Sequence, residues 1–170
     1  RGPVQLGDLG GVVTFSRALG DGSQGSARVV ADVTIGAAFL DAFNINLPPG
    51  MVSGASPARL ALDLSDADAP TFRLSSDLRG LGINLAALGW SKARGAVGEL
   101  SVAGKLGSTP HIDEVSISAP RLQATGAVRF APGGGLDRAT FQNVRLGGWL
   151  NAPVVLIGRG PGRPPDVQVA

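Results

Sequence analysis

The side chains that could carry out acid–base or nucleophilic chemistry are few in this chain. Its 170 residues include no cysteine, no tyrosine and one histidine, His111. Catalysis of these kinds needs a nucleophile beside a base, or groups that exchange a proton at the reacting atom. A base at His111 would need Asp113 or Glu114 to orient it, and neighbouring residues of a strand point to opposite faces. We therefore expect His111 to be a turn residue exposed to solvent, and we expect the chain not to be an enzyme.

Two other segments only superficially resemble ligand sites. Asp63, Asp66 and Asp68 are spaced unlike a calcium loop, which also needs a central glycine and a glutamate at its twelfth position. In Gly158-Arg159-Gly160-Pro161-Gly162-Arg163, the proline removes an amide donor, and Pro164-Pro165 prevents a helix that could bind phosphate. We interpret the first segment as an acidic hairpin end and the second as a connector between strands. No metal and no cofactor are expected.

The two tryptophans, Trp90 and Trp149, each follow glycine at the end of an expected strand. They could be interfacial anchors, but a tryptophan there is more often packed against the edge of the sheet. We therefore expect both side chains to be packed.

The composition indicates a folded chain with an unusually uncharged surface. Apolar residues make up 44%, too many for disorder, and charged residues only 16%, against about 25% in a typical protein. Arginines are scattered singly from Arg17 to Arg163, so we expect no nucleic-acid partner. No stretch approaches the roughly 18 apolar residues that span a bilayer. Because the chain begins at Arg1, we expect one β-rich segment, residues 1–170, of a longer protein.

Apolar and polar residues alternate along the chain, which is typical of strands with one buried and one wet face. In 59–65, for example, Leu60, Leu62 and Leu64 alternate with charged or small residues. Glycine and proline turns recur about every 8 to 14 residues, as consecutive antiparallel strands require. The segments that alternate are 27–35, 59–65, 71–78, 81–85, 99–102, 115–118 and 121–130.

This pattern predicts an all-β fold, an antiparallel meander of about ten strands. Short helices are expected at 37–43 and, more weakly, at 85–88, and a sub-sheet break is possible near 48–50. The one-sided strands must cover their apolar face with a second sheet, by closing, or with a ligand. The pattern alone favours a sandwich or a self-closing sheet, and it leaves a curled sheet with an apolar groove as the alternative.

Residues 58–170 resemble the AsmA-like family of Gram-negative envelope proteins, especially its YhdP-type and TamB-type branch. The first match runs from Phe72 to Leu85 and continues in Gly89-Trp90-Ser91-Lys92. The second is the strand from Leu122 to Phe130, followed by a glycine-rich turn and residues 141–146. The family's sequence pattern often has prolines where this chain has Ala86 and Ala87.

The resemblance implies a periplasmic protein, anchored to the inner membrane by a region outside this chain. It also implies a bridge-like protein whose long curled β-sheet encloses a hydrophobic groove. Proteins of this kind are implicated in moving phospholipid towards the outer membrane. The expected partners are phospholipid or another acyl-chain lipid and neighbouring β-segments of the same protein. The alternative is a closed β-sandwich or barrel for binding or assembly, without lipid transfer. The residues expected to line the groove are Leu60, Leu62, Leu64, Phe72, Leu74, Leu78, Leu100, Val102, Leu122, Val128 and Phe130.

Overall fold

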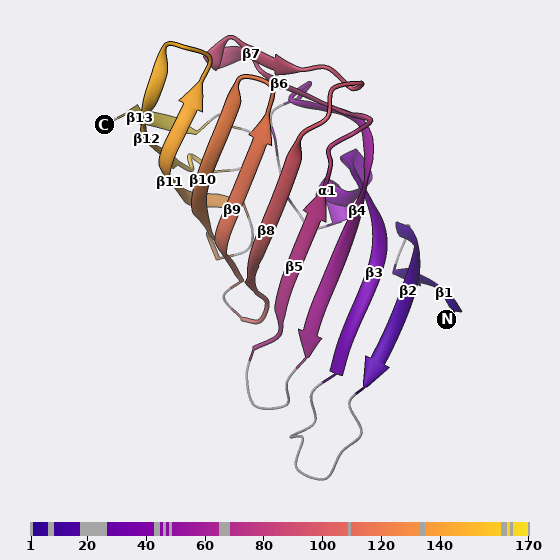
Figure 1. The fold of residues 1–170 in the computed structure, drawn as a ribbon. Helices are drawn as coiled ribbons and strands as arrows, with labels where there is room; N and C mark the ends of the chain where they lie inside the picture. The colour runs from indigo at the N-terminus through magenta and orange to yellow at the C-terminus, as the bar shows by residue number, and fades with distance from the viewer. Residues whose placement is uncertain are drawn as a thin grey trace.

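The structure of the chain is a computed structural model. It describes residues 2–6, 9–17, 27–42, 45, 47, 49–64, 69–108, 110–132, 135–160, 163 and 165–169. The fold is mostly antiparallel β, with 67% strand and 6% helix, and its sheet is curled into a half-barrel (Figure 1). This confirms the all-β fold predicted from the alternation and the curled sheet that the resemblance implies, rather than the sandwich that the pattern alone favours.

The described residues form thirteen strands, against about ten expected. Most of them follow one another across a single sheet in the order β1-β2-β3-β4-β5-β8-β9-β10-β11-β12-β13, and β6 and β7 leave this path (Figure 1). The strands are β1 (Gly2–Leu6), β2 (Leu9–Arg17), β3 (Ala27–Gly36), β4 (Val52–Leu64), β5 (Thr71–Ser76), β6 (Leu81–Leu85), β7 (Trp90–Lys92), β8 (Glu99–Lys105), β9 (His111–Ala119), β10 (Leu122–Phe130), β11 (Leu136–Leu146), β12 (Leu150–Ile157) and β13 (Asp166–Val169).

Strands β3 and β4, which flank residues 48–50, are neighbours in this sheet. Their pairing runs from Ala27 opposite Leu64 to Gly36 opposite Ala55. The segment between them therefore joins two adjacent strands.

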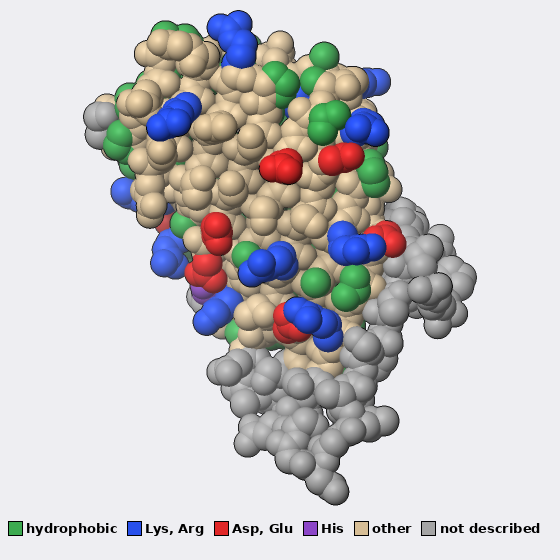
Figure 2. All heavy atoms as spheres, in the orientation of Figure 1, with side chains coloured by type: hydrophobic (Ala, Val, Ile, Leu, Met, Phe, Trp, Pro, Cys, Tyr) green, Lys and Arg blue, Asp and Glu red, His purple; other side chains and the backbone are tan. Residues whose placement is uncertain are grey.

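Alternation gives the sheet two different faces. One face carries Leu60, Leu74, Val102 and Val115, which are paired in register across β4, β5, β8 and β9. We call it the inner face. The opposite, outer face carries the intervening polar and charged residues. Figure 2 shows that face, where basic and acidic side chains are scattered among polar and backbone atoms with few hydrophobic side chains.

Glycines at β-bulges account for part of the curl. The register shifts between Ala103 and Gly104 in the β8–β9 pair, and between Thr125 and Gly126 in the β10–β11 pair. A β-carbon at Gly104 would collide with the carbonyl oxygen of His111. Bulges bend a strand and increase its twist, and glycine permits the close backbone approach.

Two short elements lie on the inner face. The helix α1 (Ala37–Ala42) packs Phe39, 8% exposed, against β3 and β4. Strands β6 and β7, with the 3-10 turn η1 (Ala86–Leu88), cross one end of the sheet (Figure 1). We call residues 81–92 the cap. Both helical segments expected from the sequence are present: α1 covers 37–42 of the expected 37–43, whose last residue lies outside the described residues, and η1 covers 86–88 of the expected 85–88.

One predicted strand ends earlier than expected. Strand β5 stops at Ser76, and Leu78 lies in a turn with a φ of 55°. The Ser76 hydroxyl accepts a hydrogen bond from the Leu78 amide at 3.1 Å, and the Asp77 carboxylate accepts one from the Arg79 amide at 3.0 Å. These side chains satisfy the backbone outside the ladder and so favour a turn.

Candidate functional site on the inner face

The inner face carries apolar side chains in continuous cross-strand rows. One row joins Leu60, Leu74, Val102 and Val115, and it continues through Gly126 to Phe141 and Val154. A second, parallel row crosses the same seven strands without a charged residue. At ~4.8 Å between neighbouring strands, each row spans roughly 29 Å. The second row consists of Leu62, Phe72, Gly104, Ile112, Val128, Ala139 and Leu156.

Burial differs between the two ends of the inner face. We call the end beneath the cap the capped end, and there the side chains are almost fully buried, for example Leu122 at 5% and Leu146 at 1% exposure. We call the other end, where β4, β8 and β10 finish, the open end. Its larger apolar side chains, including Leu62, Phe72 and Val128, are only half-buried. The most deeply buried large side chains of the described inner face therefore lie at the capped end, although Leu100, Ile117 and Leu150 there are half-buried as well.

The capped end is a dry core built by the cap itself. Trp90 of β7 is 6% exposed, and its indole Nε1 donates a hydrogen bond to the Pro120 carbonyl at 2.9 Å. This confirms the expectation that Trp90 is packed, whereas the same expectation for Trp149, 65% exposed, is wrong. The side chains that pack together there are Trp90, Leu122, Ala124, Val144, Leu146 and Val154, with Ile83, Leu85 and Leu88 of the cap against them.

A buried lysine fixes the cap. Lys92 is 3% exposed, and its ammonium donates to the carbonyls of Leu78 at 2.7 Å, Leu81 at 2.8 Å and Ala93 at 3.3 Å. These three bonds use all three donors of the group. Burial lowers the pKa of Lys92 below 10.5, and the charge of Asp77 acts weakly in the opposite direction. The sequence pattern alone gave Lys92 no such role.

The residues expected to line the groove differ in burial: four are buried and seven are half-buried. All except Leu78 lie on strands, and their alternation and register place them on the inner face. Leu78, fully buried at 0% exposure, packs in the core with Leu74 and Val102. Leu74, Val102 and Leu122 are also buried; those that are half-buried are Leu60, Leu62, Leu64, Phe72, Leu100, Val128 and Phe130.

Among the described polar candidates from the sequence, one close contact is seen, between His111 and Asp113. His111 Nε2 lies 3.2 Å from a carboxylate oxygen of Asp113, so the argument that these two residues face apart is wrong. They are two positions apart, which places strand residues on one face, and the histidine is half-buried rather than fully exposed. Asp63 pairs with Arg28 at 2.9 Å, while Asp66 and Asp68 lie outside the described residues. Within the described part of the chain, no three His, Asp or Glu side chains gather as metal ligands would.

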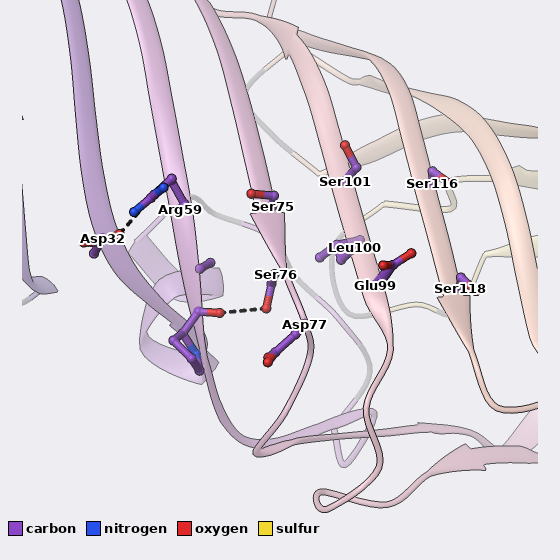
Figure 3. Close-up of a pocket in the computed structure, with 12 residues that line it drawn as sticks. Asp32, Arg59, Ser75, Ser76, Asp77, Glu99, Leu100, Ser101, Ser116 and Ser118 are labelled. Atoms are coloured by element: carbon purple, nitrogen blue, oxygen red, sulfur yellow. Dashed lines mark hydrogen bonds and ion pairs between the residues drawn. The ribbon is translucent and has the colours of Figure 1, made fainter.

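A shallow hollow of about 660 Å³ lies on the outer face. Figure 3 shows Ser75, Ser101 and Ser116 pointing into it from β5, β8 and β9. Arg59 and Asp32, paired at 3.4 Å, stand at one side of it. The hollow offers hydroxyl groups and charges for hydrogen bonding, but its lining includes no histidine to act as a base. Alternation predicts these serines on the polar side of their strands, but not that the sheet is hollowed there.

No family model, curated protein or solved structure matches this chain. Among the described helices, none has the length and apolar character to cross a membrane.

Proposed function

We propose that this chain is a segment of an AsmA-like periplasmic protein whose inner face carries the acyl chains of phospholipid during outer-membrane biogenesis. The observation that supports the proposal best is the second apolar row, from Leu62 to Leu156, which crosses seven strands without a charge and remains half-buried at its larger side chains. Contiguous apolar surface that stays accessible in a folded protein marks a ligand-binding or interaction surface.

Transfer of this kind needs burial rather than catalysis. Each methylene moved from water to an apolar surface contributes about 0.8 kcal/mol, so a row of this length can hold an acyl chain without any directional contact. Because the hydrophobic effect is non-directional, the chain can also slide along the row. The protein therefore acts as a carrier surface and not as an enzyme.

The edge of the sheet supports a partnership with further β-segments of the same protein. Strand β13 is the last strand of the described sheet and pairs only with β12. Its Val167 and Val169, opposite Leu156 and Val154, prolong the two apolar rows and are 47% and 55% exposed. A strand edge of this kind is a template for another strand. We propose that the longer protein continues the sheet there and is anchored to the inner membrane through a region outside this chain.

The competing function is that of a closed β-sandwich used for binding or assembly. A sandwich needs a second sheet over the inner face. Among the residues that the structure describes, only α1 and the cap lie over that face, and together they leave the open end half-buried. The described architecture thus favours the carrier surface.

The test is native mass spectrometry with lipid extraction, on protein purified without detergent. We expect phospholipid to co-purify at a defined stoichiometry, and Leu62→Asp on the inner face to abolish it. The matched control is Ala61→Asp, which places the same charge one position away on the outer face and should retain lipid. A stable, lipid-free wild-type monomer would contradict the proposal and favour a structural role.

A further inference from the structure

We propose that the open end carries a binding site for a phosphate group, formed by basic residues on the outer face of the strands whose inner face carries the second apolar row. This inference rests on the proposed lipid-binding function and gives the head group of the lipid a partner on the protein. The residues are Lys105, Arg129 and Arg138, with His111 between the first two in the sheet; we call them the basic row.

Strand register brings these residues together from four strands. Lys105 pairs with His111, His111 with Arg129, and Arg129 with Arg138. They therefore stand side by side on β8, β9, β10 and β11 over about 14 Å, at the usual strand spacing of ~4.8 Å. In sequence they are separated by turns and bulges, so no local motif marks them. Figure 2 shows basic side chains along the left edge of the outer face, with acidic side chains among them.

Such a row is unfavourable without an anion. Like charges directly opposite each other on neighbouring strands destabilise a sheet. Elsewhere on the outer face, Arg28 pairs with Asp63 and Arg59 with Asp32. Within the described residues, by contrast, Lys105, Arg129 and Arg138 make no ion pair, although all three are exposed.

Three acidic residues lie near the row, but none of them contacts its lysine or its arginines within the described part of the chain. Asp113 contacts His111 at 3.2 Å, and that contact involves the histidine alone. Glu114 and Asp137 are exposed on β9 and β11, and neither forms an ion pair with the row in the part of the chain that is described. The local cations and carboxylates are therefore equal in number, but Arg129 and Arg138, which stand directly opposite each other, form no ion pair with any described carboxylate.

The chemistry of the row fits phosphate. Arginine presents a planar fork of donors that binds phosphate oxygens in pairs, and lysine adds a compact positive charge. Arg129 and Arg138 stand opposite each other, so two guanidinium groups can approach one phosphate from neighbouring strands.

The position of the row fits a lipid in particular. Each basic residue is next in sequence to a member of the second apolar row: Lys105 to Gly104, His111 to Ile112, Arg129 to Val128 and Arg138 to Ala139. The two rows thus run in parallel along the open end, on opposite faces of the same strands. Long basic side chains can reach around a strand end while their stems cover apolar surface. A lipid whose acyl chain leaves the inner face over the ends of these strands would bring its phosphate to this rim.

The test compares two lipids with the same acyl chains, dioleoyl-phosphatidate and dioleoylglycerol, as competitors of a fluorescent fatty acid bound to the protein. We expect phosphatidate to bind at least tenfold more tightly, and added salt to reduce this difference. The double variant Arg129→Gln/Arg138→Gln should abolish the difference and leave dioleoylglycerol binding unchanged. The control Arg79→Gln/Arg145→Gln removes the same charge from exposed positions nearer the capped end and should keep the difference.

The outcomes separate the two proposals. If neither lipid displaces the probe, the proposed function fails. If both lipids bind wild-type protein equally, or if the control variant loses the difference as the Arg129/Arg138 variant does, the basic row is not a phosphate site. If glycerol 3-phosphate prevents the preference at the concentration at which phosphatidate acts, the row binds free phosphate esters and the assignment to a lipid is overturned. Circular dichroism of each variant verifies that it is folded.

Discussion

The capped and open ends of the inner face have the same sequence pattern but differ in how deeply their apolar side chains are buried. At both ends leucine, valine and phenylalanine alternate with polar residues, yet Leu146 at the capped end is 1% exposed while Leu62 at the open end is half-buried. The difference comes from the cap, which turns back over β10, β11 and β12 and packs its own side chains there. Alternation thus specifies an apolar face that must be covered, and the position of the cap determines which part of that face the protein covers with its own residues.

The cap behaves as a fixed wall. It is joined to the sheet through the pairing of β6 with β4, from Val52 opposite Ile83 to Gly54 opposite Leu81. Further backbone bonds join Gly80 to Arg94 and Gly98 to Asp77, at 2.8 and 2.9 Å. Removing the cap from the sheet would also break the buried hydrogen bond from Lys92 to the Leu78 carbonyl, which lies before the cap. We therefore expect a ligand to contact the open end without displacing the cap.

The largest predicted effect tests the difference between the two ends directly. Leu146→Asp would bury a carboxylate among apolar side chains without a partner, so we expect a loss of more than about 4 kcal/mol in the free energy of unfolding. Leu62→Asp, whose carboxylate can reach water, should cost about 1 kcal/mol or less. Urea unfolding followed by circular dichroism measures both. Equal losses would mean that the open end is as closed as the capped end.

An intermediate effect is expected where the sheet bends. Alanine at Gly104 would meet the His111 carbonyl oxygen, the Ile112 Cα at 2.9 Å and the Phe72 ring at 3.0 Å. Gly104→Ala should therefore cost about 1–3 kcal/mol, as overpacked positions do. At Gly95, in the loop before β8, an added β-carbon would meet no atom within 4 Å, and Gly95→Ala should change stability by less than about 0.5 kcal/mol.

Thermal unfolding compares these two alanine variants, and native mass spectrometry compares their lipid content. Because Gly104 belongs to the open apolar row, its substitution should also reduce the bound lipid. A Gly104→Ala variant as stable and as lipid-loaded as Gly95→Ala would show that the bulge does not set the shape of the open end.

The inner face could be predicted because it depends on local alternation. The leucines of 59–65 and the apolar residues of 121–130 fix which side of each strand is buried, whatever the neighbouring strand is. The isolated glycine in 99–105 could also have indicated a bulge, since glycine in a strand interior often marks one.

The buried hydrogen bonds of Lys92 and the basic row could not be predicted, because both depend on contacts between residues far apart in the sequence. Nothing near Lys92 indicates that its ammonium reaches carbonyls 11 and 14 positions earlier in the chain. Likewise, Lys105 and Arg138 belong to one row only because β8, β9, β10 and β11 pair with particular shifts. Leu78 was misplaced for a local reason, since the turn-forming hydrogen bonds of Ser76 and Asp77 end the strand before it.

The smallest predicted effect concerns the pH dependence of the capped end. Because burial lowers the pKa of Lys92 in the folded protein, the unfolded chain holds more protons at this residue between that lowered pKa and 10.5. Stability rises with pH wherever the unfolded state binds more protons. The contribution of Lys92 to the free energy of unfolding should therefore increase as the pH is raised through this window, by less than about 1.4 kcal/mol per pH unit. Below the window the residue should contribute no slope.

The measurement is urea unfolding at a series of pH values up to 10.5 for the wild type and Lys92→Met, which removes the titrating group. The methionine variant should be less stable throughout, since the Leu78 and Leu81 carbonyls lose their donor, and the difference between the two proteins should widen towards pH 10.5. A difference that stays constant with pH would mean that the Lys92 ammonium reaches water in the folded state, and that the cap is looser than a fixed wall.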